Sequence, residues 1–199
     1  KEGAVILAGL GNPGASYAGN RHNIGFMAID RLTQDYGFSK PAAKFGGLLS
    51  EGRVGLHRIH AFKPMGYMNT SGAPLAQLAN FYKIPVENLI VIHDELDLEP
   101  ARIRVKTGGG NGGHNGLKSI DAHLGQNYRR IRVGIGHPGD KNLVSDYVLS
   151  DFSKAEKPLM ETLIAEISRH MPMLLNGDEA GYMNKIVTNL PPSPLTPLS

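Results

Sequence analysis

The fold is decided by residues 4–10, which read AVILAGL and form an unbroken apolar run of strand length. A run without polar alternation is typical of a strand that is buried on both faces of a sheet. A second run, NLIVIH, covers residues 88–93 and leads into the acids Asp94 and Glu95. Polar residues at the end of a buried strand are typical of a site at the carboxyl edge of a sheet. The two runs therefore predict a central sheet with functional groups along one edge.

Helix-like patterns alternate with these strand-like runs along the chain. They cover residues 23–36, 71–83, 117–124, 153–175 with an interruption near Pro172, and 178–187. Residues 46–62 read as two strands around a turn. The alternation predicts a single α/β domain, residues 1–189, with a central mixed twisted β-sheet flanked by helices. The tail, 190–199, holds four prolines and no charge, and we expect it to be extended or disordered.

The composition excludes several classes of protein. The chain has 199 residues, of which 41% are hydrophobic and 20% charged, as in soluble globular domains. No apolar run approaches the roughly 20 residues of a membrane span, and the first residues lack the pattern of a signal peptide. We therefore expect a cytoplasmic protein. Because the sequence has no cysteine, disulfides, thiolate nucleophiles and cysteine-based metal sites are excluded.

Positive charge is concentrated between residues 101 and 132, where seven basic residues accompany a single acid. Cationic and apolar residues alternate there with the period of a strand, at Arg102, Arg104 and Lys106 and again at Arg130 and Arg132. If the two strands share a sheet, their cations line one surface. Such a surface is either a solvated sheet face or a footprint for the phosphates of nucleic acid. A non-catalytic RNA-binding module is one interpretation of this pattern.

Two glycine clusters stand beside these strands. Gly9, Gly11 and Gly14 match the G-x-G-x-x-G spacing of dinucleotide-binding proteins, which makes an NAD-dependent oxidoreductase an alternative. That motif binds a pyrophosphate only where a helix opens within it, but here helical periodicity begins at about Asn23. The second cluster, GGGNGGHNGLKS at residues 108–119, lacks the Gly-Lys-Ser of a phosphate loop. Its glycines predict a close approach of the backbone to a ligand.

One histidine and one acid stand where a general base would need them. His22 lies in the loop between the first strand and the first helix, and Asp94 follows another buried strand. An acid so placed would accept the imidazole N–H and raise the basicity of the other ring nitrogen. No nucleophile elbow and no cysteine is present, so activated water is the expected attacker. A metal hydrolase using HDELD, residues 93–97, is a competing interpretation, although this spacing does not place ligands on one helical face.

Five segments resemble, in order, the motifs of bacterial peptidyl-tRNA hydrolase. They are GLGNPGASYAGNRHNIG (9–25), FKPMGYMNTSG (62–72), HDELDL (93–98), KTGGGNGGHNGLKSI (106–120) and RIRVGIGHPG (130–139). The resemblance covers about residues 5–187. It implies a monomeric, metal-independent carboxylic ester hydrolase without a cofactor. Its substrate would be peptidyl-tRNA, cleaved at the ester between the peptide or N-blocked aminoacyl group and the 3′-terminal ribose, so that tRNA is recycled.

The resemblance also implies roles for single residues. It makes His22 the catalytic base, Asp94 its partner and Asn115 a holder of the attacking water. Substrate contacts are implied for Asn12, Met68, Asn69, Gly113 and Asn115, and Tyr17 is grouped with them because it falls within the first motif. Lys106 and Arg132 match the pair associated with the 5′-phosphate of tRNA, so the expected partner is the acceptor end of tRNA. The sequence departs from the common pattern at Asn20, Tyr67 and Asn111, where Thr, Phe and His are frequent.

Overall fold

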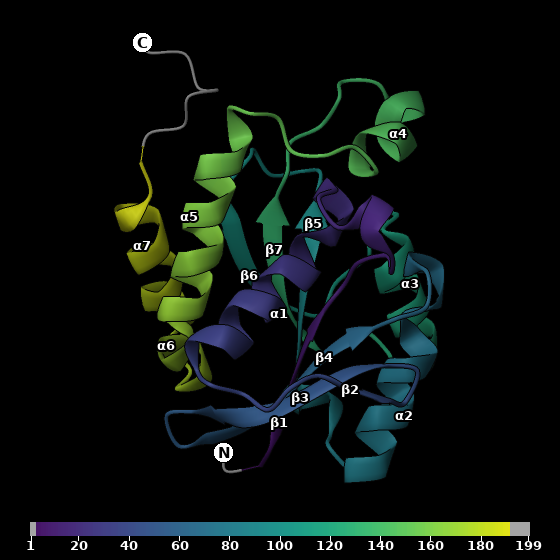
Figure 1. The fold of residues 1–199 in the computed structure, drawn as a ribbon, viewed down its shortest axis with the longest axis vertical. Helices are drawn as coiled ribbons and strands as arrows, with labels where there is room; N and C mark the ends of the chain where they lie inside the picture. Colours follow the sequence, from purple (N-terminus) through teal and green to yellow (C-terminus); the bar gives the residue numbers. More distant parts are fainter. Residues whose placement is uncertain (1–2, 192–199) are drawn as a thin grey trace.

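The structure, a computed structural model, describes residues 3–191, and within them the chain forms a seven-stranded mixed sheet in the order β2-β3-β4-β1-β5-β7-β6 (Figure 1). The strands are β1 (Val5–Gly9), β2 (Ala42–Lys44), β3 (Gly47–Val54), β4 (His57–Pro64), β5 (Leu89–Glu95), β6 (Ile103–Thr107) and β7 (Arg129–Gly134). β4, β1, β5 and β7 are parallel, whereas β2, β3 and β6 pair antiparallel to their neighbours. The prediction of a central mixed sheet is confirmed.

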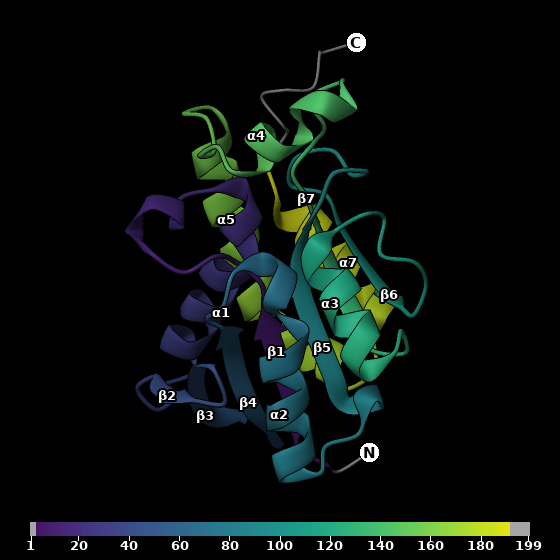
Figure 2. The same cartoon turned by 90° about the vertical axis from the view of Figure 1, so that its right-hand side faces the viewer.

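Helices cover both faces of the sheet (Figure 2). One face carries α1 (Ile24–Asp35), α5 (Glu156–Arg169), α6 (Met171–Leu175) and α7 (Glu179–Asn189), and the other carries α2 (Gly72–Tyr82) and α3 (Asn115–Leu124). α4 (Val144–Val148) lies beyond the carboxyl end of β7. Short 3-10 turns are η1 (Ala15–Tyr17), η2 (Arg21–Asn23), η3 (Met68–Thr70), η4 (Val86–Asn88) and η5 (Lys141–Leu143). Among the described residues, none of these helices has the length and apolar character needed to cross a bilayer.

The predicted elements agree with the structure except at a few boundaries. β5 continues through Asp94, which pairs in register with Val133 of β7 instead of following the strand. The long helical region breaks at His170, and Pro172 stands in the first turn of α6, where its missing N–H removes no helical bond. β2 and α4 are not predicted, because elements of three and five residues are too short to show a period. Most of the proline-rich tail, 192–199, lies outside the described residues.

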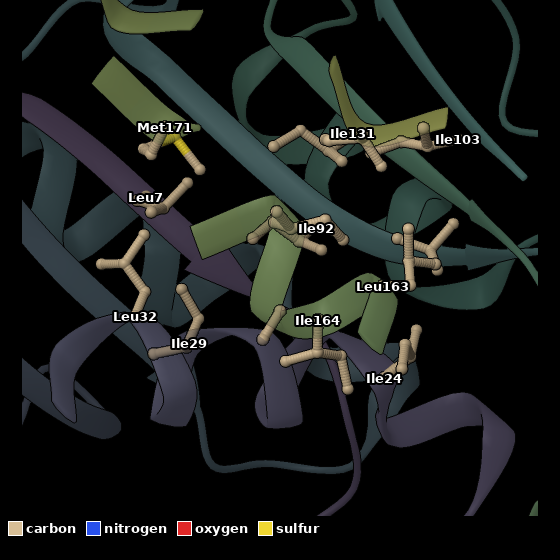
Figure 3. Packing of buried hydrophobic residues seen from close by; sticks show 14 of the residues in the cluster. Leu7, Ile24, Ile29, Leu32, Ile92, Ile103, Ile131, Leu163, Ile164 and Met171 are labelled. Carbon is tan, nitrogen blue, oxygen red and sulfur yellow. The ribbon is translucent and has the colours of Figure 1, made fainter. Parts of the chain in front are cut away.

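The core is divided into two clusters by the sheet. Leu7 of β1 and Ile92 of β5 pack towards α1 and α5, where Leu32 and Leu163 meet them (Figure 3). The alternate residues of β1, such as Ile6, pack against α2 on the opposite face. Burial on both faces explains why the AVILAGL run has no polar alternation.

The start of α1 lies very close to the sheet because two glycines meet there. A Cβ atom on Gly25 would lie 2.3 Å from the Leu10 nitrogen and 2.4 Å from the Ile92 oxygen, and one on Gly9 would lie 2.1 Å from the Gly25 oxygen. Any larger residue at these positions would push the helix away from the sheet. The two glycines therefore hold the turn that carries His22 against the carboxyl ends of β1 and β5.

Candidate active site

Three distant segments meet at the carboxyl edge of the parallel strands. His22 comes from the η2 turn after β1, Asp94 from β5, and His114 from the glycine loop before α3. His22 Nδ1 lies 2.7 Å from Asp94 Oδ2, and His114 Nε2 lies 2.7 Å from Asp94 Oδ1. The structure thus places the two residues that the sequence paired in direct contact. It adds a second imidazole, for which sequence reasoning assigned no role.

Hydrogen bonds fix the tautomers of both histidines. His114 caps α3, and its Nδ1 accepts the backbone N–H groups of Gly116 at 3.1 Å and Leu117 at 3.3 Å. The ring proton of His114 is therefore on Nε2 and is donated to Asp94. His22 donates its Nδ1–H to the other carboxylate oxygen, so that in the neutral ring His22 Nε2 is the acceptor.

Asp94 is 4% exposed, and it is held as an anion. Burial acts to raise the pKa of Asp94, but the attraction and hydrogen bonds of His114 and His22 outweigh it and keep the pKa below its usual range. A carboxylate that accepts two imidazole N–H groups is also fixed in orientation. Asp94 can therefore stabilise positive charge on His22.

His93 supports this cluster from within the protein. It is 1% exposed, its Nδ1 donates to the Asp94 carbonyl oxygen at 2.8 Å, and its ring lies edge-on to that of His114. Burial, together with the nearby His114, lowers the pKa of His93 to about 4. His93 is therefore neutral at neutral pH and adds no charge beside Asp94.

The cluster opens into a cavity of about 710 Å³. Asn12, Asn69 and Asn115 lie on its wall, and Leu96, Val144, Val148 and Leu149 add apolar surface. A cavity of this size with a few polar groups is typical of a small-ligand site or of a site for the reactive end of a larger substrate. Three of the four apolar residues come from α4 and its end, which the sequence analysis missed.

Asn12 has a fixed orientation in this cavity. Its Oδ1 accepts the Met68 N–H at 2.7 Å. Its backbone is tied to Asn23, whose side chain accepts the Asn12 N–H and donates to the Asn12 oxygen, both at 2.9 Å. The amide NH₂ of Asn12 is thus the part of the side chain left for a ligand.

The other residues expected to contact substrate divide into two groups. Asn69 and Asn115 are exposed and line the cavity, the latter as the first residue of α3. Gly113 also lines the cavity, but its N–H is already donated to Asn111 Oδ1 at 2.9 Å. Tyr17 does not line the cavity; it packs edge-to-face against Tyr67, which is 59% exposed on the cavity wall.

The basic residues lie outside the cavity, on β6 and β7. The register places Arg104 opposite Arg132 and Lys106 opposite Arg130, so the two strands do share a sheet. Arg132 Nε bonds to Glu95 Oε1 at 2.9 Å, and Glu95 belongs to the cavity wall. Arg130 departs from the expectation of one cationic surface, because its side chain is buried and bonds to the protein itself. Arg104, Lys106 and Arg132 form the remaining basic surface, whereas Arg102 lies just before β6 and pairs with Glu99.

Arg21, the residue before His22, anchors the α4 side of the cavity. Its guanidinium forms a buried ion pair with Glu156 at 2.8 Å and lies over the Tyr147 ring at 4.1 Å. It also donates to the carbonyl oxygens of Tyr147 and Ser150. These partners are distant in sequence, so no local pattern could have indicated them. The turn that positions His22 therefore also holds the opposite wall.

The residues of HDELD do not converge on a common point where they could bind a metal together. His93 Nδ1 donates to a backbone oxygen and Glu95 pairs with Arg132, and among the described residues neither side chain belongs to a group of three converging ligand atoms. The candidate ligand atoms of His22, Asp94 and His114 do lie within 4.8 Å of one another. However, the same atoms form the two hydrogen bonds described above, and a protonated Nε2 on His114 offers no lone pair to a metal. The two hydrogen bonds therefore explain why these three side chains lie close together.

The dinucleotide interpretation fails on local structure. The position of Gly9 is explained by the contact with Gly25, and a Cβ on Gly11 would lie within 2.7 Å of the Phe26 ring. Gly14 is followed by the short η1 turn, and α1 begins only at Ile24. No helix N-terminus therefore opens within the motif to receive a pyrophosphate.

Comparisons with known proteins by sequence and by structure agree with one another. A sequence model of the peptidyl-tRNA hydrolase family matches residues 6–193. The peptidyl-tRNA hydrolase of Paracoccus denitrificans is 49% identical over 188 residues, 94% of this chain and 80% of that protein. That of Parvibaculum lavamentivorans is 50% identical over 191 residues, 96% of this chain and 93% of that protein. The crystal structure of peptidyl-tRNA hydrolase from Acinetobacter baumannii at 1.00 Å resolution aligns with a TM-score of 0.87 and 42% identity, covering 92% of this chain and 94% of that chain.

Proposed function

The chain belongs to the peptidyl-tRNA hydrolase family, and from this premise we propose that it cleaves the ester bond of peptidyl-tRNA with a water molecule activated by His22. One observation carries the assignment of the base. His22 Nδ1 is held by the buried Asp94 carboxylate, and His22 Nε2 is left as a free acceptor on the cavity side. The products are the free peptide acid and deacylated tRNA.

His22 acts as a general base and then as a general acid. Its Nε2 takes a proton from water while the water oxygen attacks the ester carbonyl, and Asp94 stabilises the imidazolium that forms. As the tetrahedral intermediate collapses, the bond to the ribose oxygen breaks and the imidazolium returns the proton to that oxygen. Such assistance accelerates reactions by about 10² to 10⁴-fold. No metal is needed in this scheme, because the ester is activated by positioning and by the base.

Neutral amides are proposed to hold the reacting groups. The Asn12 NH₂ is oriented by its bond to Met68 and donates to the oxygen on which negative charge develops. Asn115 holds the attacking water beside His22. Met68 and the Gly113 backbone flank the peptide end, and Asn69 also contacts the substrate from the cavity wall. Gly113 offers its carbonyl oxygen because its N–H is engaged. Neutral donors stabilise the developing anion without adding a positive charge that would lower the basicity of His22.

Lys106 and Arg132 are proposed to bind the 5′-phosphate at the acceptor end of tRNA. Glu95 engages Arg132 through Nε, so the two terminal nitrogens of the guanidinium are left to face a phosphate. Phosphate contacts give affinity without reading base sequence, as an enzyme acting on many tRNAs requires. All groups in this scheme come from one chain, and we propose a monomer as the active unit.

The decisive experiment is the release of a labelled N-acetyl-aminoacyl group from tRNA in the presence of EDTA. The wild-type chain should cleave this substrate, and His22→Ala should lose about 10² to 10⁴-fold in kcat. His57→Ala is the matched control, because His57 is distant from the cavity and bonds to Asn176. Free aminoacyl-tRNA serves as the unblocked substrate.

Two outcomes would contradict the proposal. Loss of wild-type activity in EDTA would favour a metal hydrolase. A folded wild-type chain that binds tRNA without cleaving the ester would favour the RNA-binding module, which uses the same basic surface of Arg104, Lys106 and Arg132.

A further inference from the structure

We propose that Arg130 is a positioning residue that holds the glycine loop, residues 108–113, in place over the active site. The inference rests on the proposed function of the cavity. Arg130 stands on β7 and is 2% exposed, unlike the neighbouring basic residues. One terminal nitrogen donates to the Gly110 carbonyl oxygen, and the other donates to the Gly109 carbonyl oxygen at 2.9 Å. A buried cation thus holds two consecutive loop carbonyls.

The guanidinium is itself fixed from two sides. Its Cζ atom lies over the Tyr128 ring, 4.6 Å from the ring centroid, and its Nη2 lies 3.5 Å from Asp121 Oδ1. Tyr128 is fully buried and donates its hydroxyl proton to the same Asp121 oxygen at 2.7 Å. A planar group held by a ring, an acid and two carbonyls has little freedom to move. A lysine ammonium cannot reproduce this set of contacts, because it is not planar and cannot bond to two carbonyls in a fixed fork.

The loop needs such an anchor because of its composition. Gly108, Gly109, Gly112 and Gly113 all have positive φ angles, between 59° and 96°. Glycine loses more conformational freedom on ordering than any other residue, so a glycine-rich loop samples many conformations unless contacts restrict it. The described contacts of Arg130 fall on the first half of this loop.

A second set of contacts connects the residues around Arg130 to the part of the loop that lines the cavity. Asp121 also lies near Asn111, with 3.5 Å between Asp121 Oδ2 and Asn111 Nδ2. Asn111 in turn accepts the N–H of Gly113 with Oδ1 and the N–H of His114 with its carbonyl oxygen, at 2.9 and 3.0 Å. His114 then donates to Asp94. The network around Arg130 thus fixes the backbone that places both the cavity wall and the second imidazole.

The same contacts argue against a direct role of Arg130 in RNA binding. Both terminal nitrogens are engaged by the loop and by Asp121, and the side chain is enclosed. Arg132, two residues further along β7 and on the same face, retains 25% exposure of its side chain. A residue that contacts phosphate must be accessible to it. Arg130 therefore differs in function from Lys106 and Arg132.

The test is the variant Arg130→Lys, which keeps the charge and removes the fork. We expect kcat/KM for N-acetyl-aminoacyl-tRNA to fall about 10- to 100-fold, the loss typical of a displaced catalytic constellation. Hydrogen exchange of the amides at 109–113 should become faster by a similar factor. The Kd for deacylated tRNA, and its dependence on salt, should be unchanged, because no phosphate contact is lost.

Arg129→Gln is the matched control. Arg129 is on the same strand but on the opposite face, where it bonds to the Leu174 carbonyl oxygen and pairs with Glu179. It should retain wild-type kcat/KM and wild-type exchange in the loop. If Arg130→Lys does not fold, Asp121→Asn replaces it; this variant removes the acid beside the guanidinium but keeps an acceptor for Tyr128. It should accelerate exchange of the same loop amides.

Two results would overturn the proposal. Weaker binding of deacylated tRNA with a smaller salt dependence and unchanged loop exchange would make Arg130 a phosphate contact. Wild-type kcat/KM together with wild-type exchange would show that the loop needs no anchor. Exchange and tRNA binding are measured without catalysis, so a failure of the proposed function would appear separately, as absence of hydrolysis by the wild-type chain.

Discussion

Replacing Asp94 with asparagine tests the assignment of the base most directly. Asparagine has the same shape, but one of its two terminal atoms donates hydrogen bonds instead of accepting them. His114 cannot change its tautomer without losing the two backbone N–H groups that its Nδ1 accepts. The asparagine oxygen must therefore face His114, and its NH₂ must face His22. His22 then satisfies this donor only with an unprotonated Nδ1, which moves the proton to Nε2.

The expected loss follows from this change of tautomer. A protonated Nε2 cannot take a proton from water, so most of the general-base contribution disappears. We expect kcat to fall by about 10³-fold, equivalent to about 4 kcal/mol. The Kd for deacylated tRNA should not change, because the Asp94 side chain is buried beneath His22 and is not accessible to a phosphate. Single-turnover release of a labelled N-acetyl-aminoacyl group, with enzyme in excess, measures the chemical step.

Asp30→Asn is the matched control for the loss of one carboxylate. Asp30 is exposed on α1 and pairs with Lys63, far from the cavity. It should retain wild-type kcat. An Asp94→Asn protein that is folded and cleaves within about tenfold of the wild-type rate would refute the tautomer argument, because general-base catalysis is worth at least about 10²-fold.

Four further predictions concern other parts of the structure. His114→Ala removes one donor to the buried carboxylate and should lower kcat about 10- to 100-fold in the same assay; an unchanged kcat would contradict the role of the second imidazole. Because the pKa of His93 is lowered to about 4 from 6.5, its contribution to stability is complete above about pH 6.5 and declines towards pH 4. In urea titrations, the unfolding free energy of the wild type should therefore fall by about 2 kcal/mol more between pH 7 and pH 5 than that of His93→Gln. An equal fall in the two proteins would contradict the lowered pKa of His93. Lys106→Gln should weaken tRNA binding and reduce the slope of log K against log salt by about 1, measured by titration at several salt concentrations; an unchanged slope would exclude a phosphate contact. Gly25→Ala should lower the unfolding free energy by about 2 kcal/mol in urea and also lower kcat, since its Cβ has no room against the sheet, and full stability would show that the helix can move away.

Much of the fold was predictable from local patterns. The apolar runs of β1 and β5 and the helical periodicity of α1 and α2 were sufficient, because burial on one or both faces leaves a direct signal in the sequence. The break at His170 could be placed only near Pro172, since a proline is tolerated in the first turn of a helix. β2 and α4 carry no periodic signal and depend on tertiary contacts.

The candidate site was predictable where its residues lie close to strands or helices that have a clear apolar pattern in the sequence. His22 and Asp94 follow this rule, and the resemblance to a family added the asparagines. The role of His114 depends on hydrogen bonds at both ring nitrogens, which no spacing reveals. Arg130 was expected on a cationic surface because alternation indicates a face of the sheet, but it does not indicate whether a loop covers that face.

The use of Arg21 and His22, adjacent in one short turn, has a consequence for protein engineering. Arg21 contacts α4 through Tyr147 and the start of α5 through Glu156, while His22 lines the cavity. A design that reshapes the cavity by changing the contacts of Arg21 would disturb the base at the same time. Val144 and Val148 offer a safer route, because they line the cavity without touching that turn's ion pair. Substitutions at Val144 and Val148 would therefore change the shape of the cavity and leave the ion pair of Arg21 with Glu156 in place.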